Sequence, residues 1–292
     1  PQRVRGMKAA VMGADAHFGF RRDWRTGTLE PFHSRRSLSI LLQLIEAIEP
    51  DWSILAGDWM DYANWSGKFP KEPEFVATTQ PALIEAAYIA ARVAAVSGKT
   101  TMLEGNHDLR PERAIRESYM EGFGLCAVDN LDLPVYSVPH LLGLEKRGVE
   151  YIGGYPDGAI WLNEHTRIIH GYTVRGTPGA TAGAVVREAN QTTGFGHIHR
   201  REMASRTIRA RAGYRTITAF CPGCLCHIDG RVPGSKASDQ WQQGLSIVWY
   251  DDERATVVPV EIDNGQAVYN GARFAGDDYA ADLRREFEGW GF

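Results

Sequence analysis

The chain has 292 residues, of which 43% are hydrophobic, 10% aromatic and 23% charged, so it can form a sizeable core and is not mainly disordered. Its 32 basic and 36 acidic residues give a formal net charge of −4. This balance argues against charge-driven wrapping of a long nucleic acid, although a local basic groove is compatible with it.

Short apolar segments alternate with amphipathic segments over the first two thirds of the chain, a pattern typical of stacked βα units. Residues 34–49 have apolar positions at helical spacing, among them Leu38, Leu41 and Ile45, and Pro50 closes this segment. The other expected helices span residues 81–97, 111–121 and 181–189. The expected strands span residues 8–12, 52–56, 100–104, 167–169 and 192–195.

The last third changes character, because strands follow one another there without intervening helices. These strands are expected at residues 201–208, 214–219, 245–250 and 255–262. We therefore predict an α/β fold, a four-layer αββα sandwich in which two mixed sheets are flanked by helices.

One domain is expected to span residues 1–292. It comprises core motifs at 8–199, strands of the second sheet at 200–263 and a tail at 264–292. Within the tail, residues 277–292 are expected to form a docked terminal helix, with a partner-binding peptide as the alternative.

A cluster of polar residues follows each of the five strands in the first part of the chain. The clusters occupy residues 13–17, 57–61, 105–108, 170–171 and 196–199, and they hold five of the nine histidines. Open α/β sheets bind ligands at the carboxyl ends of their strands, so we expect these loops to form one site there.

Seven side chains in these clusters are candidate metal ligands. They are carboxylates, an amide and imidazoles, the ligand types of borderline divalent ions such as Mn²⁺, Fe²⁺ and Zn²⁺. Seven donors exceed the needs of one tetrahedral ion and match two ions that share a bridging carboxylate. The candidates are Asp15, His17, Asp58, Asn106, His170, His197 and His199.

The motifs Asp-x-His, Gly-Asp-x-x-Asp, Gly-Asn-His-Asp, His-Gly and Gly-His-x-His occur in this order between residues 15 and 199. This series resembles the calcineurin-like metallophosphoesterase superfamily. Tyr62, Ala63 and Asp108 depart from the protein phosphatase pattern, so the phosphodiesterase and nuclease branches are the nearer match. The C-terminal third also faintly resembles phosphoesterases of tailed phages.

The resemblance implies a role for each motif residue. Asp15, His17, Asp58 and His199 are implied to hold one ion, and Asp58, Asn106, His170 and His197 the other. It further implies that His107 contacts the phosphate and stabilises or protonates the leaving group, with Asp108 orienting its ring. Asp61 is expected either to support a ligand from behind or to cap a helix.

The implied activity is hydrolysis of phosphate esters, most readily phosphodiesters, by a hydroxide that bridges the two ions. Mn²⁺ is the favoured ion, with Fe, Zn or Ni as alternatives. The alternative activities are a DNA or RNA nuclease of the repair-exonuclease type and a phosphomonoesterase. A non-catalytic scaffold is disfavoured, because neither a ligand nor His107 is missing.

Several residues near the motifs are candidate substrate contacts. Arg21, Arg175 and Arg200 are suited to phosphate binding, against the alternative of solvated loop residues. Trp59 and Tyr62 are candidates for stacking on a base, against the alternative of core packing.

Four cysteines are too few for a disulfide framework in a chain of this size. Three of them, Cys221, Cys224 and Cys226, lie close together, and reduced, partly buried thiols are favoured there over a zinc knuckle. No stretch approaches about 18 consecutive apolar residues, so we expect a cytoplasmic protein without a membrane span. Its expected partner is a small phosphate ester, with nucleic acid as the alternative, and the oligomeric state stays open.

Overall fold

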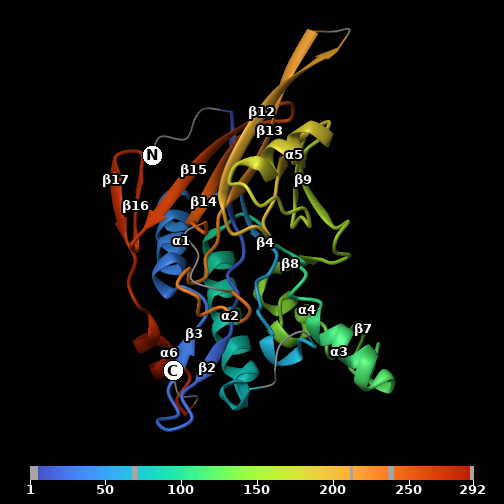
Figure 1. Cartoon of the computed structure of the whole chain (residues 1–292), viewed down its shortest axis with the longest axis vertical. Helices are drawn as coiled ribbons and strands as arrows, with labels where there is room; N and C mark the ends of the chain where they lie inside the picture. Colours follow the sequence, from blue (N-terminus) through green and yellow to red (C-terminus); the bar gives the residue numbers. More distant parts are fainter. Residues whose placement is uncertain (1–5, 68–71, 211–212, 236–239, 290–292) are drawn as a thin grey trace.

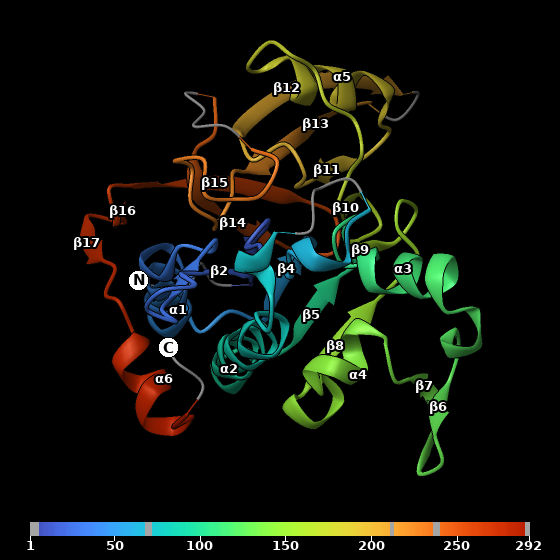
Figure 2. The same ribbon diagram turned by 60° about the horizontal axis from the view of Figure 1, so that its bottom comes forward.

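Two β-sheets lie face to face in the computed structural model of this chain, with helices against their outer faces (Figure 1). The structure describes residues 6–67, 72–210, 213–235 and 240–289. Figure 2 shows the second sheet and α5 above, and the first sheet with α1 and α2 below. The predicted α/β fold with two mixed sheets and flanking helices is therefore confirmed.

The first sheet has eight strands in the order β17-β16-β15-β14-β1-β4-β5-β8. Its central strands β1, β4, β5 and β8 run parallel, whereas β14 pairs antiparallel with β1 and starts an antiparallel extension. The strands are β1 Lys8–Gly13, β4 Trp52–Ala56, β5 Thr100–Leu103, β8 Val149–Ile152, β14 Gln243–Tyr250, β15 Ala255–Asp263, β16 Gln266–Tyr269 and β17 Ala272–Ala275.

The second sheet has five strands in the order β12-β13-β11-β10-β9. Strands β10, β11 and β13 run parallel, and β9 and β12 are antiparallel to their neighbours. The strands are β9 Ala159–Asn163, β10 Thr166–Ile169, β11 Thr192–Gly194, β12 Arg201–Ala210 and β13 Gly213–Pro222.

The prediction that the strands of residues 200–263 all belong to the second sheet is wrong for β14 and β15. These two strands extend the first sheet beside β1. The reason lies in β14, where the consecutive residues Leu245, Ser246, Ile247 and Val248 are all buried. A strand buried on both faces suits the interior of a sheet that is covered on both sides.

Six α-helices complete the described fold, and the four predicted in the first two thirds of the chain appear within three residues of their expected ends. Ser34 caps α1, since its hydroxyl accepts a hydrogen bond from the Ser37 amide. The helices are α1 Arg35–Ile48, α2 Thr79–Val96, α3 Arg110–Ser118, α4 Val138–Leu142, α5 Ala180–Glu188 and α6 Ala280–Glu286. No helix among the described residues is both long enough and apolar enough to cross a bilayer.

Short elements fill the connections between these layers. They are the strand pairs β2 Phe20–Arg22 with β3 Leu29–Pro31 and β6 Cys126–Ala127 with β7 Asn130–Pro134, and the 3₁₀ turns Ala63–Trp65, Pro73–Phe75, Met120–Gly122 and Glu145–Arg147. The predicted terminal helix is shorter than expected, and it docks through the buried Leu283. Trp290 and Phe292 of the predicted tail lie outside the described residues.

Alternate residues of β1 pack into two different layers, as the period of a strand requires. Ala9 and Val11 belong to the apolar cluster shared with α1 and α2. Ala10 and Met12 belong to the cluster between the sheets, together with Phe220 of β13. This packing fixes β1 between the helix layer and the second sheet, so that its carboxyl end emerges beside those of β4, β10 and β11.

A buried ion cluster joins α1 to α2 behind the first sheet. The Glu85 carboxylate accepts two hydrogen bonds of 2.9 Å from the Arg35 guanidinium and lies 2.8 Å from His33 Nε2. Burial alone raises the pKa of Glu85, but His33 and Arg35 outweigh it and hold the pKa at about 2. The ionised carboxylate therefore depends on these two partners.

We expect Glu85→Ala to lower the free energy of unfolding by about 3–5 kcal/mol, because it leaves the buried Arg35 guanidinium without its carboxylate partner. The matched control is Glu46→Ala, which removes a surface pair with Arg92 in which the side chains are 52% and 39% exposed. Such pairs contribute about 0–1 kcal/mol. Urea denaturation of both variants tests this, and equal losses would contradict it.

The same cluster predicts a direction for the pH dependence of stability. Because the pKa of Glu85 is lower in the folded chain than its ordinary value of 4.5, its contribution is complete above pH 4.5 and is lost as the pH falls toward about 2. Urea titrations between pH 6 and pH 2 should show a smaller pH dependence for Glu85→Ala than for the unsubstituted chain.

Candidate metal centre

Five of the seven predicted ligands have a left-handed backbone, which is uncommon for residues other than glycine. Their φ angles are 53° for Asp15, 53° for His17, 48° for Asp58, 70° for His197 and 55° for His199. Such conformations persist only where the surrounding structure enforces them, and they cluster at functional sites. The strand ends are therefore built to aim these side chains at one place.

The first group of converging donors comes from the ends of β1 and β11. Asp15, His17 and His199 each offer one ligand atom, and these atoms all lie within 4.8 Å of one another. His199 Nε2 lies 3.4 Å from Asp15 Oδ1 and 3.0 Å from His17 Nε2. All three side chains are buried, so their lone pairs converge in a space shielded from solvent.

The second group comes from the ends of β4, β10 and β11. Asp58, His170 and His197 have donor atoms within 4.8 Å of one another. His170 Nε2 lies 3.3 Å from Asp58 Oδ2 and 3.3 Å from Asn106 Oδ1. The structure thus brings the predicted ligand Asn106 to the same nitrogen.

Asp58 connects the two groups. Its Oδ1 atom accepts a hydrogen bond of 2.7 Å from the His107 amide. Its Oδ2 atom lies 3.3 Å from His170 Nε2 and 3.9 Å from His17 Nε2, and so faces both groups. This position is the one that a bridging carboxylate needs.

Oxygen atoms behind the histidines fix two of the rings. His17 Nδ1 lies 3.0 Å from Asp61 Oδ2, and His170 Nδ1 lies 2.9 Å from the Ala56 carbonyl oxygen. Each Nδ1 therefore carries the proton, which leaves Nε2 as the acceptor that points into the centre. Asp15 is fixed as well, because its carboxylate accepts hydrogen bonds of 2.9 and 3.1 Å from the His197 amide.

Two glycines are required by the close approach of these loops. A Cβ atom on Gly57 would lie 2.3 Å from His170 Nδ1, and one on Gly105 would lie 2.2 Å from the Asp58 backbone nitrogen. Gly57 also has a φ of 87°, which favours glycine. A larger residue at either position would separate the ligand loops.

His107 lies at the edge of the centre and is held by Asp61. Its Nδ1 atom is 3.2 Å from Asp61 Oδ2, and its Nε2 atom is 3.9 Å from Asp58 Oδ2. Burial and the Arg110 charge lower the pKa of His107, but the carboxylates of Asp58 and Asp61 prevail and raise it. The sequence analysis missed Arg110, whose guanidinium lies 3.0 Å from His107 Nε2.

The prediction that Asp108 orients His107 is wrong. Asp108 accepts hydrogen bonds from the amides of Met60 and Gly105, at 3.0 and 2.9 Å. It therefore joins the loops after β4 and β5, while Asp61 makes the contact with His107. Of the two roles considered for Asp61, it does not cap the neighbouring 3₁₀ turn, whose N-cap is Tyr62, and its carboxylate lies 3.0 Å from Nδ1 of the predicted ligand His17.

The predicted aromatic contacts are corrected, because both side chains belong to the core. Trp59 is fully buried and its indole nitrogen donates a hydrogen bond to the Ala86 carbonyl oxygen. Tyr62 is 4% exposed. Neither ring can stack on a substrate without leaving the apolar cluster beneath α2.

Arg200 is also corrected as a substrate contact. Its buried guanidinium donates hydrogen bonds to the Arg175 carbonyl oxygen and to Thr181 Oγ1, and it lies 3.1 Å from Glu202. These contacts fix the loop before α5 and use the donors that a phosphate would need. The side chain of Arg175 itself is exposed.

Arg21 lies on the small β2–β3 pair. One of its guanidinium nitrogens is 3.9 Å from Glu72, and the guanidinium carbon is 5.8 Å from the centre of the Phe75 ring. These contacts tie it to the segment before α2 rather than to the ligand loops.

Comparison with known proteins gives one family and low-identity relatives. The family model described as calcineurin-like phosphoesterase matches residues 14–201, more than half of the chain. The Gene 54 protein of Mycobacterium phage D29 is 24% identical over 247 residues, covering 82% of this chain and 93% of the relative. The Gene 54 protein of Mycobacterium phage L5 is 23% identical with the same coverage.

Solved structures match with low similarity. The phosphoesterase YfcE from E. coli is 14% identical, with a TM-score of 0.36, over 92% of this chain and 100% of that one. A dimetal phosphatase from Danio rerio is 8% identical, with a TM-score of 0.38, over 86% of this chain and 95% of that one.

We expect Asp61→Ala to weaken Mn²⁺ binding by about 10–100-fold, because the substitution removes the oxygen that fixes the His17 ring. Calorimetric titration with Mn²⁺ measures this effect. Asp252→Ala is the control, since Asp252 is exposed in the turn between β14 and β15. Equal affinities of the two variants would show that Asp61 does not support a metal ligand.

Proposed function

This chain belongs to the calcineurin-like phosphoesterase family, and we propose that it hydrolyses phosphodiesters at a centre for two divalent ions. The observation that carries the proposal is the position of Asp58, whose Oδ2 atom faces both groups of donors. The left-handed backbone of five ligands supports it independently.

The donor groups divide the proposed ligands between the two ions. Asp15, His17 and His199 would hold one ion, and His170 and His197 would hold the other with Asn106, while Asp58 would contribute to both. When bound, two such ions lower the pKa of water and offset the charge of the phosphoryl group. Carboxylate, amide and imidazole donors suit Mn²⁺, with Fe, Zn or Ni as alternatives.

His107 is the proposed proton donor to the leaving oxygen. Its side chain is 15% exposed, so a substrate that reaches the centre can contact the ring. Asp61 holds Nδ1, which leaves Nε2 as the atom that would carry the transferred proton. The Arg110 guanidinium lies 3.0 Å from the same Nε2 atom and donates a hydrogen bond of 2.8 Å to the Asp61 carbonyl oxygen. Because a guanidinium only donates, Nε2 accepts from Arg110 until a bound substrate replaces this contact.

The engaged arginines favour a diester over a monoester. A phosphomonoester dianion carries one more negative charge than a diester and is commonly bound by arginine. Here Arg200 is committed to its own loop, Arg21 lies beside Glu72, and Arg110 is held by Asp61, which leaves the exposed Arg175 as the remaining candidate. The substrate we propose is a small phosphodiester.

We expect His107→Asn to lower kcat for bis(p-nitrophenyl) phosphate by about 10²–10⁴-fold, the usual contribution of a positioned general acid. Metal content measured by mass spectrometry should stay unchanged, because His107 is not one of the proposed ligands. His140→Asn, on α4 and outside the motifs, is the control. Unchanged turnover in His107→Asn would remove the proposed role.

The substrate class is tested with the Mn²⁺-loaded protein. We expect a higher kcat/KM for bis(p-nitrophenyl) phosphate than for p-nitrophenyl phosphate, and no turnover after dialysis against EDTA. A preference for the monoester would favour a phosphomonoesterase. Nicking of supercoiled plasmid that is faster than hydrolysis of the small diester would favour the nuclease alternative.

A further inference from the structure

Two buried thiols lie directly behind the proposed centre. Cys224 and Cys226 are free and fully buried in the segment between β13 and β14. The intervening Leu225 donates its amide hydrogen to the carbonyl oxygens of Ala14 and Asp15, at 3.1 and 3.2 Å. The backbone that carries the thiols is therefore fixed against the first ligand loop.

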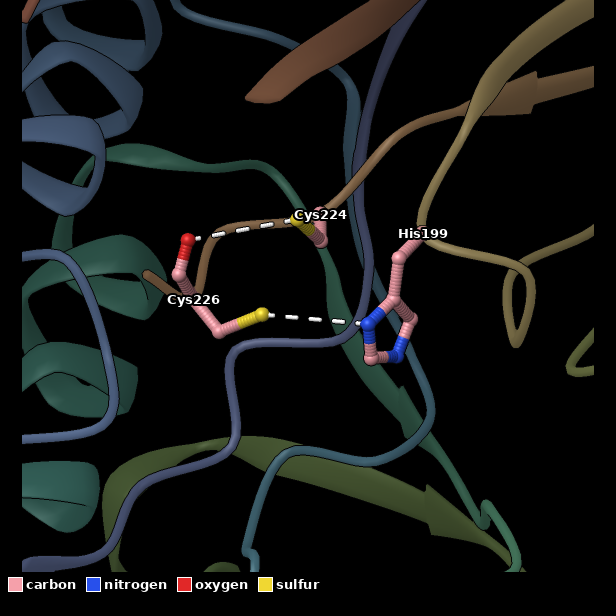
Figure 3. A group of neighbouring side chains, drawn as sticks. All are labelled: His199, Cys224 and Cys226. Atoms are coloured by element: carbon pink, nitrogen blue, oxygen red, sulfur yellow. Dashed lines mark hydrogen bonds between the residues drawn. The ribbon is translucent and has the colours of Figure 1, made fainter. Parts of the chain in front are cut away.

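His199 lies between these thiols and the proposed centre. Its Nε2 atom faces Asp15 and His17, whereas its Nδ1 atom lies 3.9 Å from Cys226 Sγ (Figure 3). In His17 and His170 the corresponding nitrogen faces an oxygen at 3.0 and 2.9 Å. A metal-bound histidine normally donates the hydrogen of its other ring nitrogen to an oxygen. At His199 Nδ1 a sulfur atom takes the place of that oxygen.

The distance between Cys226 Sγ and His199 Nδ1 fits two ligands of one ion. Cys224, Cys226 and His199 each offer a donor atom, and all three lie within 4.8 Å of one another. Zn–S and Zn–N bonds of about 2.3 and 2.05 Å place the two ligand atoms about 3.6 Å apart in tetrahedral geometry and about 3.8 Å apart in trigonal geometry. The observed 3.9 Å from Cys226 Sγ to His199 Nδ1 matches the trigonal value closely.

We propose that Cys224, Cys226 and His199 Nδ1 form a second metal site, specific for a thiophilic divalent ion such as Zn²⁺. Thiolates select soft or borderline ions, so Mn²⁺ and Mg²⁺ are poor occupants. The surroundings are apolar, with Phe32, Phe75 and Val232 in the same cluster as both cysteines. Two thiolates and one divalent ion sum to zero charge, which suits such a pocket.

Binding at this site exchanges two thiol protons, released to solvent, for the ion. With the phosphoesterase centre empty, His199 offers Nδ1 to the thiol site and keeps its one ring proton on Nε2. When Nε2 also binds an ion of the proposed phosphoesterase centre, this proton is released to solvent as a third proton, and the ring is then an imidazolate shared by the two sites. The site does not depend on the choice of phosphodiester as substrate.

The test uses Co²⁺ as a spectroscopic probe on the full chain, stripped of metal under reducing conditions. Saturating Co²⁺ should produce the near-ultraviolet absorption of a cobalt–thiolate bond in the unsubstituted protein. Cys224→Ser, Cys226→Ser and the double variant should lose it. Cys221→Ser is the matched control and should keep it, because the buried Cys221 Sγ faces the Gly196 carbonyl oxygen instead.

Zn²⁺ content supplies a second measurement. After saturation and gel filtration, the unsubstituted protein should retain one Zn²⁺ per chain more than the double variant. Mn²⁺ titration confirms that the variant is folded and keeps the other centre. No cobalt–thiolate band in the unsubstituted protein would overturn the proposal whether or not the variants fold, and a band that persists in the double variant would also overturn it.

Discussion

Asp58 places an ionised carboxylate at the buried point where the ligand loops meet. It is 1% exposed, and burial alone raises its pKa; nevertheless His170 and His107 hold the pKa well below the usual range. An ionised group in this position requires compensating charge from all sides. The fold supplies imidazoles from β1, β10 and the loop after β5, and bound cations would supply more, so the sheet ends must meet at this residue.

The convergence of the ligand loops on Asp58 costs conformational energy. This energy is stored as backbone strain in the loops. Left-handed backbone at Asp15, His17 and Asp58 costs of order 1–3 kcal/mol at each residue. The layers on either side of β1 offset this strain, since Ala9 and Val11 pack toward the helices while Ala10 and Met12 pack toward the second sheet. The rigid core thus holds the ligands in positions that a short peptide would not adopt.

The sequence predicted the parts of this arrangement that are local. Strand ends followed by polar clusters predicted which side chains converge, because a strand and its following loop are contiguous in the chain. That Asp61 rather than Asp108 contacts His107 could not be predicted, since the placement of the loops after β4 and β5 relative to each other decides which carboxylate faces the ring. Arg200 and β14 were misplaced for a similar reason: their partners Thr181 and β1 are distant in the sequence and are set by tertiary packing.

The same packing explains why chemically different environments meet at His199. The Leu225 amide donates its hydrogen to the carbonyl oxygens of Ala14 and Asp15, so the chain passes directly behind the first ligand loop. A cysteine lies on either side of Leu225 in the sequence. The Nε2 atom of His199 therefore faces a carboxylate oxygen, and its Nδ1 atom faces sulfur. Oxygen and sulfur donors select different ions, so the two nitrogens of one ring can bind metals of different types. The charge of each ion then acts on the other across the ring. The ring of His199 separates the thiols from the donor group of Asp15 and His17, so a charge on either cysteine acts on that group across this ring. The segment between β13 and β14 is therefore part of the environment of the proposed reaction.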